Sequence, residues 1–218
     1  MCFSPIGDLV VGTVVVAIGV DACRNLGGRT QDLPLATLPL LLGAHQIDEA
    51  LVWWSLQGRV SAQVGHVAVW IYLLVALVVL PVFVPVALGA SESSPRLRRR
   101  YVPFAGLGIF VAGVMLETLL VGSPTAELGS HYLAYSIGLQ HGVVLTGLYA
   151  TATCGPLLRS GRRLLIQFGV ANLIAVIPIA VLYSRSFASL WCLYAAMVSG
   201  VIALRVRARQ PIAGFRHS

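Results

Sequence analysis

Apolar residues fall into seven long runs that are separated by short polar segments. Each run is about 20 residues long, which is the length that a helix rising ~1.5 Å per residue needs to cross the ~30 Å core of a bilayer. The runs cover residues 6–23, 34–57, 64–89, 102–122, 131–156, 164–183 and 187–205. This pattern predicts an all-α fold, with one seven-helix transmembrane domain over residues 1–205 and a basic cytoplasmic tail at 206–218.

The arginines divide unequally between the two sides of these predicted spans. Thirteen lie in the segments that follow odd-numbered spans, whereas two, Arg59 and Arg185, follow even-numbered spans. Basic residues in short loops stay on the cytoplasmic side of a membrane. We therefore predict a multi-pass protein of a cell membrane, with its N-terminus outside and its C-terminus cytoplasmic.

Composition agrees with a membrane protein and excludes several classes. Hydrophobic residues make up 57% of the 218 residues and charged residues 11%, whereas about a quarter of a soluble domain is charged. The net charge of +7 lies in short clusters between apolar runs, so it does not indicate nucleic-acid binding. No lysine is present, which excludes a retinal Schiff base, and four scattered cysteines form no zinc motif.

The second predicted span carries polar residues in its middle. His45, Asp48 and Glu49 share one helical stripe, because residues three and four apart lie on the same face, and Trp53 lies at its edge. An ionisable side chain inside a membrane costs several kcal/mol and by default marks a functional site. This stripe is therefore the first candidate site.

Other polar and aromatic residues are predicted at the same depth, in the outer half of the bundle. The fourth span ends there and the fifth begins there, and we predict a cavity lined by residues of several helices. Its members are Glu117, His131, Tyr132, Tyr135, His141 and Trp191. Asp8 of the first span lies at a similar level, but because it is near a helix end it is interpreted as an interfacial or arginine-paired residue.

Prolines and glycines inside the spans indicate how the helices pack. Prolines free backbone carbonyls that neighbouring helices can satisfy, and glycines allow close helix contact. The prolines are Pro39, Pro81, Pro85 and Pro178, and the glycines are Gly106, Gly108, Gly113, Gly138, Gly142 and Gly147.

Acid catalysis in an apolar cavity is the first functional interpretation. A carboxyl group that is desolvated beside another carboxylate stays protonated and becomes a competent acid. Either Glu49 or Asp48 supplies the proton in this hypothesis, His45 reloads it, and His131 or Glu117 accepts the final proton. Aromatic faces would stabilise a carbocation by cation–π attraction, which suits a lipophilic polyene or epoxide.

Two other interpretations use the same residues. His45 and Glu49, four residues apart, could bind a metal ion that His131 or His141 completes. In a proton-coupled transporter or a lipid-ligand binding protein, the buried groups would bind or relay protons instead.

Four short motifs carry a resemblance to known proteins. They are Met-Cys-Phe-Ser at 1–4, Gly-Ala-His-Gln-x-x-Glu-Ala at 43–50 followed by Trp53, His-Tyr-Leu-Ala-Tyr-Ser at 131–136, and Phe-Ala-Ser-Leu-Trp-Cys at 187–192. The chain resembles a family of small bacterial seven-helix membrane proteins of unknown function, which implies a location in the bacterial cytoplasmic membrane.

The chain is also similar to the membrane-bound terpene cyclases of actinobacterial indole-terpenoid pathways. That resemblance implies proton-initiated cyclisation of a farnesyl-type chain on an indole-like acceptor, without a metal or other cofactor. Its partners would be a lipophilic prenylated substrate and membrane lipid. Trp53, Tyr132, Tyr135, Trp191 and His141 would then line the substrate channel.

Overall fold

The computed structural model of the chain describes residues 4–26, 30–129, 133–138 and 142–182, together with residues 196 and 200. This part of the chain is mostly helical. Its elements are, in order, α1 (Pro5–Arg24), η1 (Thr30–Asp32), α2 (Leu33–Ala36), α3 (Leu38–Leu56), α4 (Ala62–Leu73), η2 (Leu74–Val79), α5 (Leu80–Ala90), α6 (Pro95–Arg98), η3 (Arg99–Tyr101), α7 (Val102–Val121), β1 (Thr125–Leu128), β2 (Leu133–Ser136), α8 (Gly142–Leu158) and α9 (Arg163–Leu182).

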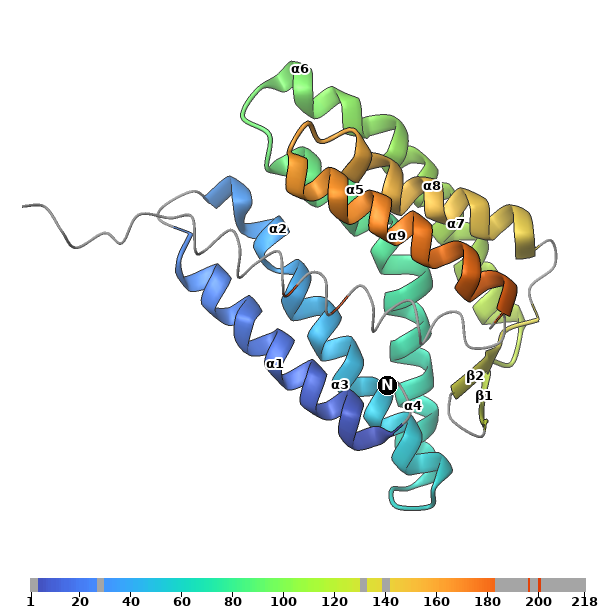
Figure 1. The fold of residues 1–218 in the computed structure, drawn as a ribbon. Helices are drawn as coiled ribbons and strands as arrows, with labels where there is room; N and C mark the ends of the chain where they lie inside the picture. Colours follow the sequence, from blue (N-terminus) through green and yellow to red (C-terminus); the bar gives the residue numbers. More distant parts are fainter. Residues whose placement is uncertain are drawn as a thin grey trace, which may run out of the picture.

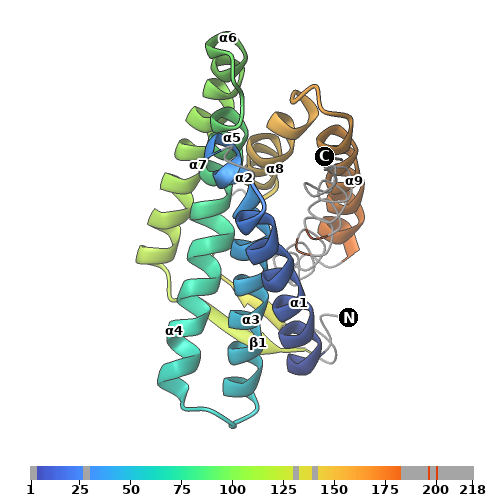
Figure 2. The ribbon, with the colours of Figure 1, turned by 90° about the vertical axis from the view of Figure 1, so that its left-hand side faces the viewer.

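The helices form two neighbouring groups that one long helical segment joins (Figures 1 and 2). In the first group, α1 and α4 both pack against α3. The segment α4–η2–α5 then continues into the second group, where α5, α7, α8 and α9 pack together. The short hairpin β1–β2 contacts α3 and follows the end of α7. The second predicted span is thus covered by helices on two sides.

Three helical segments in the described part are long and apolar enough to cross a membrane: Pro5–Arg24, Ala62–Ala90 and Pro95–Val121. They coincide with the first, third and fourth predicted spans. The helix α3 is 19 residues long but carries His45 and its polar neighbours in its middle, which lowers its hydropathy. The second and sixth predicted spans coincide with α2–α3 and α9, and the seventh lies outside the described residues apart from positions 196 and 200.

The prediction of an all-α fold is wrong at the fifth span. Residues 133–136 form strand β2, which pairs antiparallel with β1, and the helix begins only at Gly142. Leu133 and Tyr135 are two residues apart on the strand, so their side chains lie on the same face of the hairpin. Leu133 is fully buried on this face. After β2, Gly138 has a positive φ of 66°. A glycine in this left-handed conformation breaks the apolar run before α8.

The middle of the α4–α5 segment is a π-helix rather than an α-helix. Here the Leu80 N–H donates to the carbonyl of Val75, five residues earlier. The next bond of this type would come from residue 81, but proline has no N–H. The carbonyl of Ala76 instead accepts a 2.6 Å hydrogen bond from the Tyr149 hydroxyl of α8. A neighbouring helix thus satisfies the carbonyl that Pro81 frees, as predicted.

We expect Tyr149→Phe to lower the free energy of unfolding by about 1 to 2 kcal/mol, because a buried carbonyl loses its donor. The measurement is unfolding of the purified protein in detergent. Thr151→Val is the control on the same helix, since it removes an exposed hydroxyl that bonds within α8. Equal stability of the two variants would contradict this role for Tyr149.

Close contact between α1 and α3 depends on glycines. A Cβ atom built at Gly12 would lie 2.7 Å from the Gly43 carbonyl oxygen, and one at Gly43 would lie 2.8 Å from the Gly12 carbonyl oxygen. A Cβ at Gly19 would meet the backbone nitrogen of Leu40 at 2.7 Å. Residue numbers rise along α1 as they fall along α3, so the two helices are antiparallel. This register positions the functional residues of both helices.

Candidate functional site

The polar stripe predicted on the second span faces the inside of the structure. His45, Gln46 and Glu49 are buried on α3, with 3% of His45 and none of the other two exposed, whereas Asp48 is half-buried. This face meets α1 and α4, so the helix packing buries it. Of the two acids that the sequence left open, Glu49 is the more deeply enclosed.

A hydrogen bond within α3 orients the Glu49 carboxyl group. The side-chain amide of Gln46 donates from Nε2 to Oε2 of Glu49 at 3.1 Å. Gln46 lies three residues before Glu49, so both side chains project from the same face. His45 lies one turn from Glu49, and neither of its ring nitrogens has a hydrogen-bond partner among the described residues.

Asp8 of α1 lies at the same level as Glu49. Since Gly12 packs against Gly43 and Ile47 of the antiparallel helix, the preceding turn of α1 faces the following turn of α3. The carboxyl group of Asp8 accordingly lies near the indole of Trp53. Asp8 is fully buried. No arginine pairs with it among the described residues, which contradicts the arginine-paired interpretation, whereas its depth relative to a membrane interface stays a prediction.

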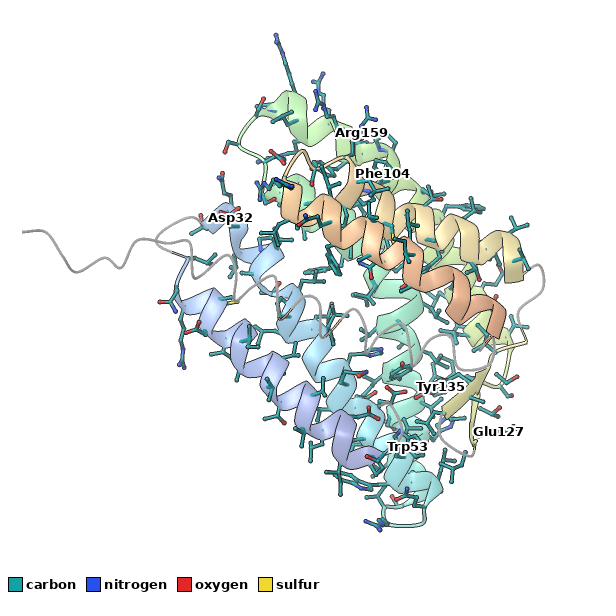
Figure 3. The ribbon with its side chains drawn as sticks, viewed as in Figure 1. Asp32, Trp53, Phe104, Glu127, Tyr135 and Arg159 are labelled. Carbon is teal, nitrogen blue, oxygen red and sulfur yellow. The ribbon has the colours of Figure 1, made fainter. Side chains whose placement is uncertain are left out.

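Three aromatic rings from three elements stack in one column. The ring centroids of His45 and Tyr72 lie 4.0 Å apart at an interplanar angle of 17°, and those of Tyr72 and Tyr135 lie 4.5 Å apart at 7°. Tyr72 comes from α4 and is fully buried, while Tyr135 comes from β2. Tyr135 and Trp53 lie toward the same end of the molecule (Figure 3). The hairpin thus completes the site with Tyr135, from a strand where a helix was predicted.

Glu117 lies outside this cluster. Its side chain is exposed near the end of α7, whereas Met115 and Leu119 are buried. Two helical residues turn the side chain by roughly 200°, so Glu117 points away from the face that packs inward. Glu117 was assigned to the site only from its expected depth along the helix. Its position around the helix axis directs its side chain away from the cluster.

Four predicted site residues lie outside the described residues, and nothing in the structure tests them: His131, Tyr132, His141 and Trp191. Among the residues that the structure does describe, no three His, Cys, Asp or Glu side chains are grouped to hold a metal ion. The predicted metal set needs His131 or His141, so this alternative stays a prediction.

A small cavity lies beside the other half of α3. Its volume is about 40 Å³, and its walls come from α3, α5, α8 and α9. Leu38 and Leu42 line it from the first two turns of α3, with Tyr149 and Asn172 from the second group of helices. It is distinct from the outer-half cavity that the sequence predicts, several walls of which are not described.

Signals for two of the site residues were weak in the sequence. Tyr72 lies within an apolar run and Gln46 carries no charge, so neither stands out from its span.

No curated protein and no solved structure shows a significant match to the chain. The model of a family of unknown function, DUF6629, matches residues 1–217. The chain therefore belongs to the DUF6629 family, as the resemblance to a family of unknown function predicted.

Proposed function

We propose that the chain is an intramembrane enzyme that protonates a lipophilic prenylated substrate and cyclises its chain. The observation that carries this proposal is the pair of fully buried acids, Asp8 and Glu49, which two packed helices hold at one level beside His45 and Trp53. Buried acids in a structure with apolar helices are costly, and acid–base chemistry explains why both are present.

Glu49 is the proton donor in this proposal. Because Gln46 donates to Oε2, that oxygen keeps carbonyl character and Oε1 carries the acidic proton. Protonation of a trisubstituted olefin forms one C–H bond and leaves a tertiary carbocation on the neighbouring carbon. The electron pair of the next double bond then closes the ring, and the indole of Trp53 stabilises the cation.

Asp8 accepts the final proton in this proposal. It replaces the acceptors expected from the sequence, since Glu117 is exposed and His131 lies outside the described residues. Loss of one proton from the cyclised cation forms a double bond and gives a neutral isomer of the substrate. His45, one turn from Glu49, then relays the proton that Asp8 has accepted back to Glu49 between cycles, which regenerates both groups. The proposed reaction is therefore an isomerisation that consumes no co-reactant.

The proposal includes a bundle of seven transmembrane helices with the N-terminus outside. Support comes from the arginine asymmetry and from the chain direction, which reverses between α1, α3, the α4–α5 segment, α7, α8 and α9 (Figure 1). In this topology Trp53 and the buried acids lie in the outer half, and a prenyl chain would enter laterally from the lipid.

Incubation of the purified protein in vesicles with a farnesylated indole, or with its terminal epoxide, tests the proposal. We expect a product of unchanged mass by mass spectrometry. In D₂O, olefin initiation fixes one deuterium on carbon, whereas epoxide opening puts deuterium on an exchangeable hydroxyl.

Failure to convert either substrate would overturn the proposal. Activity that disappears on chelation, together with stoichiometric metal in the protein, would favour the metal alternative instead. Proton-coupled flux in vesicles without a chemical product would favour a transporter.

A further inference from the structure

Five exposed arginines gather on two loops at the end of the molecule opposite Trp53. Arg159 marks this end in Figure 3. We call this group the basic surface, and it consists of Arg96, Arg99, Arg100, Arg159 and Arg163. The first three belong to the segment between α5 and α7, and the other two flank the turn between α8 and α9.

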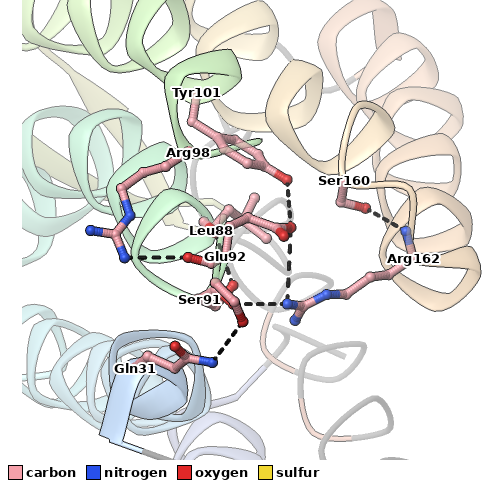
Figure 4. Close-up of polar contacts among 9 residues, drawn as sticks. Gln31, Leu88, Ser91, Glu92, Arg98, Tyr101, Ser160 and Arg162 are labelled. Carbon is pink, nitrogen blue, oxygen red and sulfur yellow. Dashed lines mark hydrogen bonds and ion pairs between the residues drawn. The ribbon is translucent and has the colours of Figure 1, made fainter. Parts of the chain in front are cut away.

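Another arginine fastens the two loops together (Figure 4). Arg162 donates from Nη2 to the carbonyl oxygen of Ser91 at 2.9 Å and lies 3.9 Å from the Glu92 carboxylate. The hydroxyl of Tyr101 donates to the same carboxylate at 3.3 Å. Segments about 70 residues apart in the sequence are thereby held side by side.

The acidic side chain of these two loops, Glu92, is already paired within this network. Glu92 is engaged by Arg162 and Tyr101, and Arg98 donates to its backbone carbonyl at 3.2 Å. The five members of the basic surface have no side-chain hydrogen bond or ion pair with any residue that the structure describes. Their positive charge is therefore available to a ligand.

We infer that the basic surface binds the phosphodiester headgroups of anionic phospholipids. Arg96, Arg99 and Arg100 lie in the first turns of Pro95–Val121, one of the segments long and apolar enough to cross a membrane. Guanidinium groups at the end of such a segment lie at headgroup level, where their fork of N–H donors matches phosphate oxygens. Clustered arginines next to a transmembrane helix attract anionic lipid. This inference is independent of the proposed reaction.

Binding of phosphatidylglycerol and of phosphatidylcholine to the full-length protein in detergent, measured by native mass spectrometry, tests the inference. We expect the wild type to retain phosphatidylglycerol preferentially. The triple variant R96Q/R99Q/R100Q should bind it at least about tenfold more weakly, with phosphatidylcholine unchanged, because each arginine near a membrane surface contributes substantially to the attraction.

Two further variants separate a lost ligand site from a lost fold. R96K/R99K/R100K keeps the charge and should keep most of the binding, whereas Arg59→Gln removes an exposed charge from the α3–α4 connection and should have no effect. Equal binding of the two lipids by the wild type, or full retention by the glutamine variant, would overturn the inference. Displacement of phosphatidylglycerol by an equal concentration of inorganic phosphate would also overturn it, since it would indicate a site for soluble anions.

Discussion

Glu49→Gln is expected to reduce conversion of a prenylated indole by at least about 100-fold while the chain stays folded. A general acid typically contributes 10²–10⁴-fold to a rate. The glutamine side chain has nearly the same volume, and its carbonyl oxygen can accept the hydrogen bond from Gln46 that Oε2 of Glu49 accepts now. The acidic proton is the property that the substitution removes. Initial rates in vesicles measure the loss, and the unfolding midpoint shows that the fold is retained.

Three matched variants give this result its meaning. Asp48→Asn changes a half-buried acid next to Glu49, so we expect a smaller loss. Glu127→Gln makes the same chemical change at an exposed position on β1 and should leave the rate unchanged. Glu117→Gln tests whether an acid at the right depth but on the outer face of its helix takes part in the reaction. Because Glu117 is exposed, we expect a nearly normal rate. Wild-type activity of Glu49→Gln would remove Glu49 from the mechanism.

Local periodicity was sufficient to predict one wall of the site. The positions of His45 and Glu49 on one stripe of α3 follow from their spacing of four residues, and the structure buries both. Asp8 and Tyr72 required information that no single span contains. Asp8 is buried because the close approach of α1 to α3 covers it, and Tyr72 joins the site because α4 presents its ring to His45.

The hairpin shows a different limit of sequence patterns. A run of apolar residues long enough for a span was interpreted as one helix from 131 to 156, although glycines at 129 and 138 bracket the short stretch that contains β2. The length of the run favoured a helix. The pairing of Ala126 with Tyr135 brings the Tyr135 ring to Tyr72. This contact joins separate segments of the chain, so the local sequence around Tyr135 does not predict it.

The predicted role of glycine is confirmed at Gly108 of α7, where an added Cβ would collide with the backbone carbonyl of Pro81 on α5. It is not confirmed at the two neighbouring glycines of the same helix. Cβ atoms built at Gly106 and Gly113 of α7 meet nothing within 4 Å, so these glycines face open space. A further tight contact, which the sequence did not predict, lies between Gly12 and Gly43. Apolar spans with glycines look alike in sequence, and the choice of partner helix decides which glycine is in contact.

Gly43→Leu is expected to lower the free energy of unfolding by about 3 kcal/mol and to abolish turnover at the same time. Its Cβ would lie 2.8 Å from both the Gly12 carbonyl oxygen and the Val16 backbone nitrogen, so the new side chain must push backbone away from backbone. Overpacking of this kind typically costs 1–3 kcal/mol or more. Separation of α1 from α3 would also move Asp8 away from Trp53 and Glu49, which would dismantle the acid pair.

Gly113→Leu is the matched control, because it makes the same change on α7 at an exposed position with open space around it. That variant should retain its stability and its rate, since leucine also has the higher helix propensity. Unfolding in detergent and initial rates in vesicles measure both effects. If the two leucine variants behave alike, the contact between α1 and α3 does not hold the site together. If Gly43→Leu loses stability but keeps its rate, Asp8 has no part in the chemistry, because the reaction would then proceed without its position opposite Glu49.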